Sequence, residues 1–243
     1  MPRFLHRSEI VAVALIAATF SLRAAVPLAR TEIANLPPPV DLPVTQTTLL
    51  QEFKTPARCD PGRPATAWGA SLVPIDTKCL ETAKETGIVF RGPMHFNRAG
   101  PEFMREVAKA QKLKAKIVFV QINSPGGDMN AGIAIGRWLH ENKHVRIKIP
   151  QWCASACAIA VLGAGPGRIT LAPGAQISLH QAFDVETGET LIAKTNQVAR
   201  GLQGLGLPAT AAAGMMRTPP EDGYILRASE REAYGIKQED AQS

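Results

Sequence analysis

The chain contains the sequence KIVFVQINSPGG at residues 116–127, in which an apolar run ends on a Ser-Pro-Gly-Gly turn. The run is long enough to form a strand that is buried on both faces of a sheet. Two short motifs follow it, CASAC at residues 153–157 and SLHQ at residues 178–181. Glycines at the end of a strand, a serine among small residues and a histidine are the groups that an acyl-transfer site needs. We therefore expect the rest of the fold to position these three motifs.

Strand-like and helix-like segments alternate around these motifs. Short β-prone runs are predicted to form strands at residues 88–91, 116–123, 145–149 and 177–180. Apolar residues at helical spacing predict helices at residues 101–113, 129–142, 155–162, 197–216 (interrupted at 204–208) and 228–234. This alternation predicts an α/β domain with parallel strands.

The N-terminal residues 1–25 have the pattern of an export signal. Two arginines precede an apolar run at residues 10–22, and a basic segment before a short apolar segment is typical of exported proteins. Arg23 interrupts the small residues at which a signal peptidase would cut, so cleavage and retention as a membrane anchor through residues 10–29 both stay open. We expect an exported protein, either periplasmic or secreted, or anchored in the membrane by the uncleaved segment.

Length and composition favour one domain with an extension. A chain of 243 residues with 45% hydrophobic residues can bury a full core. Residues 26–86 contain a proline-rich linker and little periodicity, so we predict an extension there and the α/β domain at residues 87–243. The net charge is +6, and no basic run is interleaved with aromatic residues. Nucleic acid is therefore not an expected partner.

The four cysteines are expected to fall into two groups. Cys59 and Cys79 lie in the extension at a separation that suits a disulfide loop, as an oxidising compartment would allow. Cys153 and Cys157 are expected to be reduced, because two cysteines four apart at a helix start can hardly reach disulfide geometry. None of the cysteines has the spacing to histidines that zinc sites use. We expect no metal and no cofactor.

Ser155 is the candidate nucleophile. Its neighbours Ala154 and Ala156 leave room for a substrate carbonyl to approach the hydroxyl. A serine before a helix is on its own more often an N-cap than a nucleophile. His180 changes this balance, because it ends a predicted strand parallel to the one that leads to Ser155. The imidazole could then accept the proton of the serine hydroxyl.

Gly126 and Gly127 supply the third part of the candidate site. Backbone N–H groups at such a turn are not covered by side chains, which suits an oxyanion hole. A tight turn that needs glycine conformations would use the same residues. Each motif therefore has a purely structural explanation, but their combination favours a serine hydrolase.

The motifs at residues 122–127, 153–156 and 177–181, in this order, resemble the Clp protease proteolytic subunit. The resemblance covers about residues 87–236, and that family lies in the fold group that includes crotonases. It implies the ClpP/crotonase-like fold, an α/β architecture of repeated β-β-α units in a superhelix, here as a single domain with an N-terminal extension.

The resemblance also implies roles for individual residues. Ser155 would be the nucleophile and His180 the general base, and the backbone N–H groups of Gly127 and Ala156 would form the oxyanion hole. The substrate chain would bind in extended form beside Gly126 and Gly127. A peptide or protein substrate is therefore expected.

The family's catalytic acid has no direct counterpart in this chain. Counting back from Tyr234 places its position at Gly223, so we choose the neighbouring Asp222 as the candidate acid. The other candidate acids are Glu221, Asp184 and Glu186. The segment between His180 and the final helix is also shorter than in the family, which leaves ring assembly, and with it the homo-oligomeric state, open.

The resulting hypothesis is an exported serine peptidase that works through an acyl-enzyme on Ser155. A serine–lysine variant with Lys194 as the base is a subsidiary hypothesis. Cys153 is not expected to be a nucleophile, because nothing in the sequence lowers its pKa. A non-catalytic exported or membrane-anchored binding module on a degenerate fold is the alternative from another functional class. Acyl-coenzyme A chemistry fits poorly, because coenzyme A is not expected outside the cytoplasm.

Overall fold

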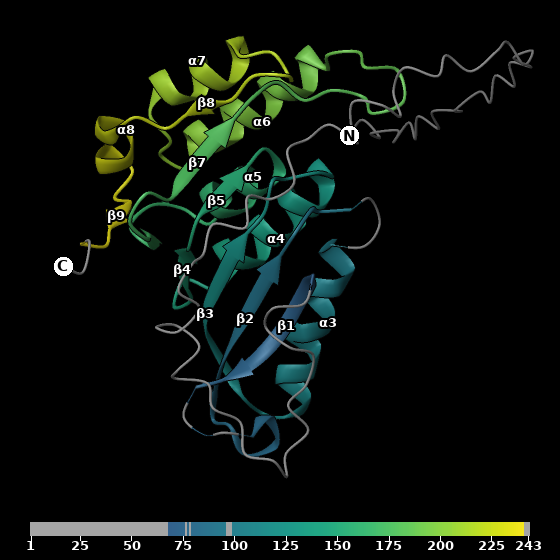
Figure 1. The fold of residues 1–243 in the computed structure, drawn as a ribbon, viewed down its shortest axis with the longest axis vertical. Coiled ribbons are helices and arrows are strands. Elements are labelled where there is room, and N and C mark those ends of the chain that lie inside the picture. Colours follow the sequence, from purple (N-terminus) through teal and green to yellow (C-terminus); the bar gives the residue numbers. More distant parts are fainter. Residues whose placement is uncertain (1–67, 76, 78, 96–98, 241–243) are drawn as a thin grey trace, which may run out of the picture. The chain divides into compact units, whose positions relative to one another are not determined.

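Six strands form the main sheet of this computed structural model (Figure 1). Their spatial order is β1 (Gly69–Pro74), β2 (Glu85–Arg91), β3 (Lys116–Asn123), β4 (Arg146–Ile149), β6 (Ile169–Leu171) and β9 (Lys237–Gln238). Neighbouring strands are parallel except for β1 and β2, which are antiparallel. The predicted parallel α/β architecture is therefore confirmed.

The structure describes residues 68–75, 77, 79–95 and 99–240. The predicted export segment at residues 1–25, and Cys59 within the predicted extension, lie outside these residues. Strand β1 comes from the predicted extension and forms an edge of the main sheet. Of the helices in the described part of the chain, none is both long enough and apolar enough to cross a membrane.

A smaller sheet carries two of the three sequence motifs. It consists of β5 (Trp152–Ala154), β7 (Gln176–Leu179) and β8 (Tyr224–Ile225), with β5 parallel to β7 and β8 antiparallel to β7. Ser124, directly after β3, joins the two sheets. Its backbone N–H donates to the carbonyl of Trp152 at 2.9 Å, and its carbonyl accepts from the N–H of Ala154 at 3.0 Å. The ends of β3, β5 and β7 are thereby brought together.

Six α-helices are described, together with a 3-10 turn at Leu80–Thr82. They are α3 (Ala99–Lys112), α4 (Met129–Glu141), α5 (Ala156–Gly163), α6 (Ile192–Gly204), α7 (Ala209–Arg217) and α8 (Ala228–Ala233). The predicted helices and the interruption between α6 and α7 are confirmed, but α6 begins at Ile192, five residues before the predicted start at residue 197. The unpredicted strands β5, β6, β8 and β9 are two or three residues long, which is too short for a periodic pattern.

Helices α4 and α5 pack unusually closely, and this contact supports the residue that follows Ser155. The N-terminus of α4 is capped by Asp128, whose carboxylate accepts from the N–H of Asn130 at 2.9 Å. A Cβ atom at Gly132 would lie 2.3 Å from the carbonyl oxygen of Ala156. Glycine is therefore required on α4 at this position so that the first turn of α5 can lie against it.

Arg168 connects the C-terminal ends of the same two helices. Its guanidinium donates to the carbonyl of Asn142 at 3.0 Å and to the carbonyl of Ala164, the residues directly after α4 and α5. It also donates to the carbonyl of Val145 at 3.4 Å. Carbonyls at helix C-termini lack partners within the helix, so Arg168 supplies the donors that the ends of α4 and α5 need.

Glu230 on α8 makes stability depend on pH. Burial alone would raise the pKa of Glu230, but hydrogen bonds from the Tyr224 hydroxyl and the Arg227 N–H outweigh it and lower the pKa below 4.5. The folded state therefore gains stability above pH 4.5 and loses it as the pH falls through the lowered pKa. We expect Glu230→Gln to lower the free energy of unfolding by about 1 kcal/mol at pH 7.

The difference between wild type and Glu230→Gln should shrink as the pH is lowered below 4.5. Urea unfolding followed by circular dichroism at several pH values measures it. The matched control is Glu232→Gln, because Glu232 is an exposed residue on the same helix. A difference that grows at low pH would contradict this account of Glu230.

Candidate active site

Ser155 occupies a sharp turn between β5 and α5. Its backbone φ is 55° and its ψ is −122°, a conformation that residues other than glycine rarely adopt. Holding a serine there costs of order 1–3 kcal/mol, which the surrounding contacts must offset. Strained strand-to-helix turns of this kind expose the nucleophilic serine of α/β-hydrolases. The strain is thus the local feature that separates Ser155 from an ordinary N-cap serine, and its side chain caps no N–H of α5.

The sheet places Ser155 and His180 at the ends of adjacent strands. Ala154 pairs with Ser178 in the parallel register of β5 and β7, and the N–H of Ser155 donates to the carbonyl of Ser178 at 2.9 Å. His180 directly follows β7, so both residues lie at the carboxyl ends of neighbouring parallel strands. The predicted placement of Ser155 and His180 after parallel strands is confirmed, but the strand was wrong: the predicted strand at residues 145–149 is β4 of the main sheet, and the unpredicted β5 leads into Ser155.

The His180 ring has one polar partner among the described residues. Its Nδ1 lies 2.7 Å from the carbonyl oxygen of Gln181, and an Nδ1–H that donates there would leave Nε2 free to accept a proton. Within the described part of the chain, no hydrogen bond joins the His180 ring to the Ser155 hydroxyl. Such bonds are often long or absent until a substrate is bound.

Gln181 is itself held by the segment that ends α7. Its backbone N–H donates to the carbonyl of Thr218 at 2.9 Å, and its side-chain amide donates to the carbonyl of Met216 at 2.6 Å. The carbonyl that faces His180 therefore belongs to a residue fixed on both its backbone and its side chain. No role for Gln181 could be predicted from its residue type, because this contact is made by a backbone atom.

Gly126 lies directly against the turn at Ser155. A Cβ atom at Gly126 would be 2.5 Å from the Cβ of Ser155 and 3.0 Å from the backbone nitrogen of Ala156. The φ of Gly126 is 98° and that of Gly127 is 131°, both values that favour glycine. The glycine turn and the serine turn are therefore in contact, as the combination of motifs suggested.

Two backbone N–H groups at this contact make no hydrogen bond to another described residue. They belong to Gly127 and Ala156, whereas the neighbouring N–H of Gly126 donates to the side chain of Ser124 at 3.1 Å. Ala156 is the first residue of α5, and N–H groups in the first turn of a helix have no partner within the helix. These two donors have the chemistry that an oxyanion hole needs.

Asn123 and Ser124 are residues of the site that the sequence analysis missed. Asn123 accepts from the N–H of Trp152 at 3.1 Å and donates to the side chain of Gln151 at 2.9 Å. Ser124 is buried and holds the N–H of Gly126. Both residues fix the glycine turn to the start of β5. Polar residues at the end of an apolar strand were the available signal.

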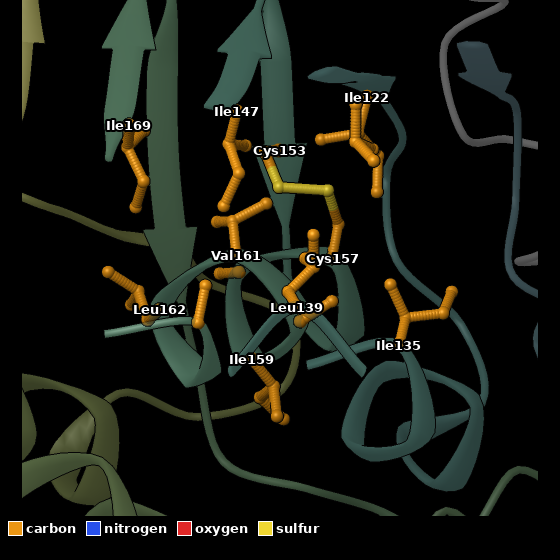
Figure 2. Packing of buried hydrophobic residues seen from close by; sticks show 14 of the residues in the cluster. Ile122, Ile135, Leu139, Ile147, Cys153, Cys157, Ile159, Val161, Leu162 and Ile169 are labelled. Carbon is orange, nitrogen blue, oxygen red and sulfur yellow. A yellow bond between two sulfur atoms is a disulfide. The ribbon is translucent and has the colours of Figure 1, made fainter. Parts of the chain in front are cut away.

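Cys153 and Cys157 form a disulfide, so the prediction that both are reduced was wrong. Their Cα atoms are 5.2 Å apart, within the range that a disulfide needs. The prediction placed both residues at a helix start, but Cys153 lies in β5 and Cys157 in α5. The reversal at Ser155 brings the strand and the helix together. Figure 2 shows the disulfide inside the buried hydrophobic cluster.

Cys79 is also disulfide-bonded. Its predicted partner, Cys59, lies outside the described residues. Among the residues that the structure describes, no group of three or more histidine, cysteine, aspartate or glutamate side chains could hold a metal ion.

No hydrogen bond joins Asp222 to the His180 ring in the described structure. Asp222 is exposed, and its backbone N–H donates to the carbonyl of Pro219 at 3.1 Å in a turn before β8. No contact in the described structure therefore supports the predicted role of Asp222 as the catalytic acid. The other candidate acids also make no hydrogen bond to the His180 ring in the described structure. They are Glu221, Asp184 and Glu186.

The remaining candidates have positions of their own. The carboxylate of Asp184 accepts from the N–H groups of Glu186 and Thr187. These hydrogen bonds, above all the one from Thr187, lower the pKa of Asp184. Lys194, the alternative base, lies in the first turn of α6 and makes no hydrogen bond to Ser155 among the described residues.

Comparison with known proteins identifies similar sequences. Residues 81–200 match the family model described as Clp protease. Two ATP-dependent Clp protease proteolytic subunits are similar over 78 residues, one from Mesostigma viride at 36% identity and one from Chlorokybus atmophyticus at 33%. Each match covers 30% of this chain and 33% of the relative, so the chain matches about a third of the length of these curated relatives.

A solved structure is similar at lower identity. The ClpP protease catalytic domain from Plasmodium falciparum has a TM-score of 0.46 and 16% sequence identity, covering 63% of this chain and 86% of that chain. The family match contains Ser155 and His180, whereas Asp222 lies beyond it. Over residues 81–200, therefore, this chain is similar to the Clp protease family.

Proposed function

We propose that this chain is an exported serine peptidase that forms an acyl-enzyme on Ser155. The observation that carries the proposal is the strained backbone of Ser155 at the carboxyl end of β5, beside the strand that ends at His180. The match to the Clp protease family over the residues that hold both side chains supports it. A peptide or protein is the substrate class, and a homo-oligomeric state stays a prediction.

Acylation would use groups that already surround the turn. The Ser155 hydroxyl attacks the substrate carbonyl carbon while Nε2 of His180 takes its proton. The oxygen of that carbonyl becomes negatively charged and accepts from the N–H groups of Gly127 and Ala156. The bond to the leaving amine then breaks, and the amine takes the proton from His180. The products of this step are a free amine and an ester on Ser155.

Hydrolysis returns the enzyme to its starting state. A water molecule attacks the ester while His180 again accepts a proton, and the same two N–H groups stabilise the second oxyanion. His180 then returns the proton to the Ser155 oxygen as the ester bond breaks. The Gln181 carbonyl orients the imidazole throughout by accepting from Nδ1–H, which stabilises the positive charge of the ring less than a carboxylate would.

The experiment for this proposal is digestion of a peptide library by the purified protein, with cleavage products identified by mass spectrometry. We expect wild type to cleave and Ser155→Ala to leave the library intact. Ser229→Ala is the matched control, because Ser229 is exposed on α8. Equal cleavage by wild type and Ser155→Ala would refute the proposal, and absence of cleavage in both would favour the binding module.

Replacing Asp222 tests which group orients His180. Because the Gln181 carbonyl occupies Nδ1, we expect Asp222→Asn to lower kcat/KM less than about tenfold, measured on a peptide that wild type cleaves. Loss of the acid in a catalytic triad costs about 10⁴-fold. A loss of that size with unchanged thermal stability would instead make Asp222 the catalytic acid.

Export is supported by the disulfide between Cys153 and Cys157. Disulfides persist in oxidising compartments and are rare in the cytosol. We expect the full chain, expressed with a C-terminal tag in a bacterial host, to appear outside the cytoplasmic fraction with this disulfide formed. Recovery from the cytoplasmic fraction alone would contradict export.

A further inference from the structure

We propose that the disulfide between Cys153 and Cys157 positions the catalytic turn. The reactivity of Ser155 then depends on whether these two cysteines are oxidised to the disulfide. This inference rests on the proposed role of Ser155 as the nucleophile. It assigns to the cysteine pair a function beyond filling the core, and it makes the redox state of the compartment a condition for full activity.

The disulfide closes a small ring around Ser155. Cys153 is the middle residue of β5 and pairs with Ile177 on β7, whereas Cys157 is the second residue of α5. The two cysteines are four apart in the sequence, so the ring contains the whole turn. The strand and the helix therefore cannot separate at this point without breaking the sulfur–sulfur bond.

Other contacts hold the two sides of the turn to different neighbours. On the strand side, Ala154 is bonded to Ser124, and the Ser155 N–H is bonded to Ser178. On the helix side, Ala156 packs against Gly132 of α4. The first group of contacts belongs to the sheets and the second to the helix pair. The disulfide joins these two groups directly across the strained residue.

The strain at Ser155 explains why such a link matters. A φ of 55° is unfavourable for serine, so the turn would relax toward an ordinary conformation if the strand and helix could shift. Relaxation would move the hydroxyl relative to His180 and to the N–H of Ala156. A displacement of about 1 Å in an active site can lower the reaction rate about 100-fold. We therefore expect loss of the disulfide to lower the rate of reaction at Ser155 more than it lowers the stability of the fold.

Both sulfur-bearing residues are fully buried, at 0% exposure. Figure 2 shows them in the same cluster as Ile122, Ile147 and Val161. Replacing the cysteines therefore also removes core volume, and a loss of stability alone would not establish positioning. Val161→Ala is the matched control, because it removes buried volume from the same helix but lies outside residues 153–157.

The experiment measures the second-order rate of labelling by a fluorophosphonate probe on the full oxidised chain, together with the melting temperature. We expect Cys153→Ala/Cys157→Ala to be labelled about 10- to 100-fold more slowly than wild type at a temperature where both are folded. Val161→Ala should melt earlier than wild type but should be labelled at nearly the wild-type rate.

A reduced wild-type sample tests the same point without a substitution. A dithiol reduces the disulfide to two thiols and is itself oxidised to a cyclic disulfide. We expect labelling to slow by a similar factor and to recover after reoxidation with glutathione disulfide. If the double variant does not fold, the labelling rate of the reduced wild-type sample tests the positioning role instead. If reduction also unfolds the protein, the positioning role is refuted in favour of a folding role.

The outcomes separate this proposal from the one on which it rests. Equal labelling rates for oxidised wild type and the folded double variant, or for oxidised and reduced wild type, would overturn the positioning role while leaving Ser155 as the nucleophile. No labelling of oxidised wild type, or equal labelling of Ser155→Ala, would instead overturn the proposed function.

Discussion

Replacement of His180 by alanine is expected to lower kcat/KM for a cleaved peptide by about 10³- to 10⁴-fold. The imidazole would be the group that takes the Ser155 proton in acylation and returns it in hydrolysis. Its Nδ1 is already directed at the Gln181 carbonyl at 2.7 Å, which leaves Nε2 available for this role. Because binding of the substrate does not require the ring, KM should change much less than kcat.

His144→Ala is the matched control for this variant, because His144 is exposed and precedes β4, whereas the candidate site lies at the carboxyl ends of the strands. Steady-state kinetics and melting temperatures of both variants give the comparison. Full activity of His180→Ala would remove the proposed base and favour the serine–lysine alternative with Lys194. Equal losses in both variants would show that the assay reports general damage to the protein.

Replacement of Gly126 by alanine is the second large effect that we expect. The added methyl group would lie 2.5 Å from the Cβ of Ser155 and 2.6 Å from the carbonyl oxygen of Ala154, distances that atoms do not tolerate. Either the glycine turn or the serine turn must move. We expect fluorophosphonate labelling to slow at least about 100-fold and the free energy of unfolding to fall by about 1–3 kcal/mol.

Gly174→Ala separates this contact from simple backbone strain. Gly174 also has a positive φ, of 77°, but an added Cβ there would meet nothing within 4 Å. We expect it to destabilise the fold by about 1–2 kcal/mol without changing the rate of labelling. If Gly126→Ala and Gly174→Ala had the same labelling rate, the contact between the glycine turn and Ser155 would not matter for reactivity.

The arrangement of the long elements could be predicted because their patterns are local. The sequence shows the apolar run of β3, the helical spacing of α4 and the strand before His180. Because the carboxyl ends of parallel strands lie at the same edge of a sheet, residues that follow such strands are expected to lie close together. Ser155 and His180 do follow neighbouring parallel strands, but the neighbour of β7 is the unpredicted β5, and the predicted strand at residues 145–149 is β4 of the main sheet.

The disulfide could not be predicted because it depends on one backbone conformation. Had residues 153–157 been a continuous helix start, the two cysteines could hardly have bonded, as the sequence analysis argued. The positive φ of Ser155 reverses the chain and sets the Cα atoms of Cys153 and Cys157 5.2 Å apart. Strand β5, which carries Cys153, is only three residues long and has no pattern of its own.

The orientation of His180 was out of reach for a different reason. The partner of Nδ1 is a backbone carbonyl, that of Gln181, and every residue has one. A search for a catalytic acid considers carboxylates alone, and it led to Asp222 by its distance from the final helix. The contacts of Gln181 with Met216 and Thr218 arise from the packing of α7. No sequence motif predicts these contacts.

The measurement that tests the central claim most directly is the mapping of a fluorophosphonate adduct by mass spectrometry. The full oxidised chain is treated with the probe, its intact mass is recorded, and its peptides are sequenced. We predict one added phosphonyl group, located on Ser155, and no adduct on Ser155→Ala. An adduct on another residue, or an intact mass unchanged after prolonged treatment, would contradict the assignment of Ser155 as the nucleophile.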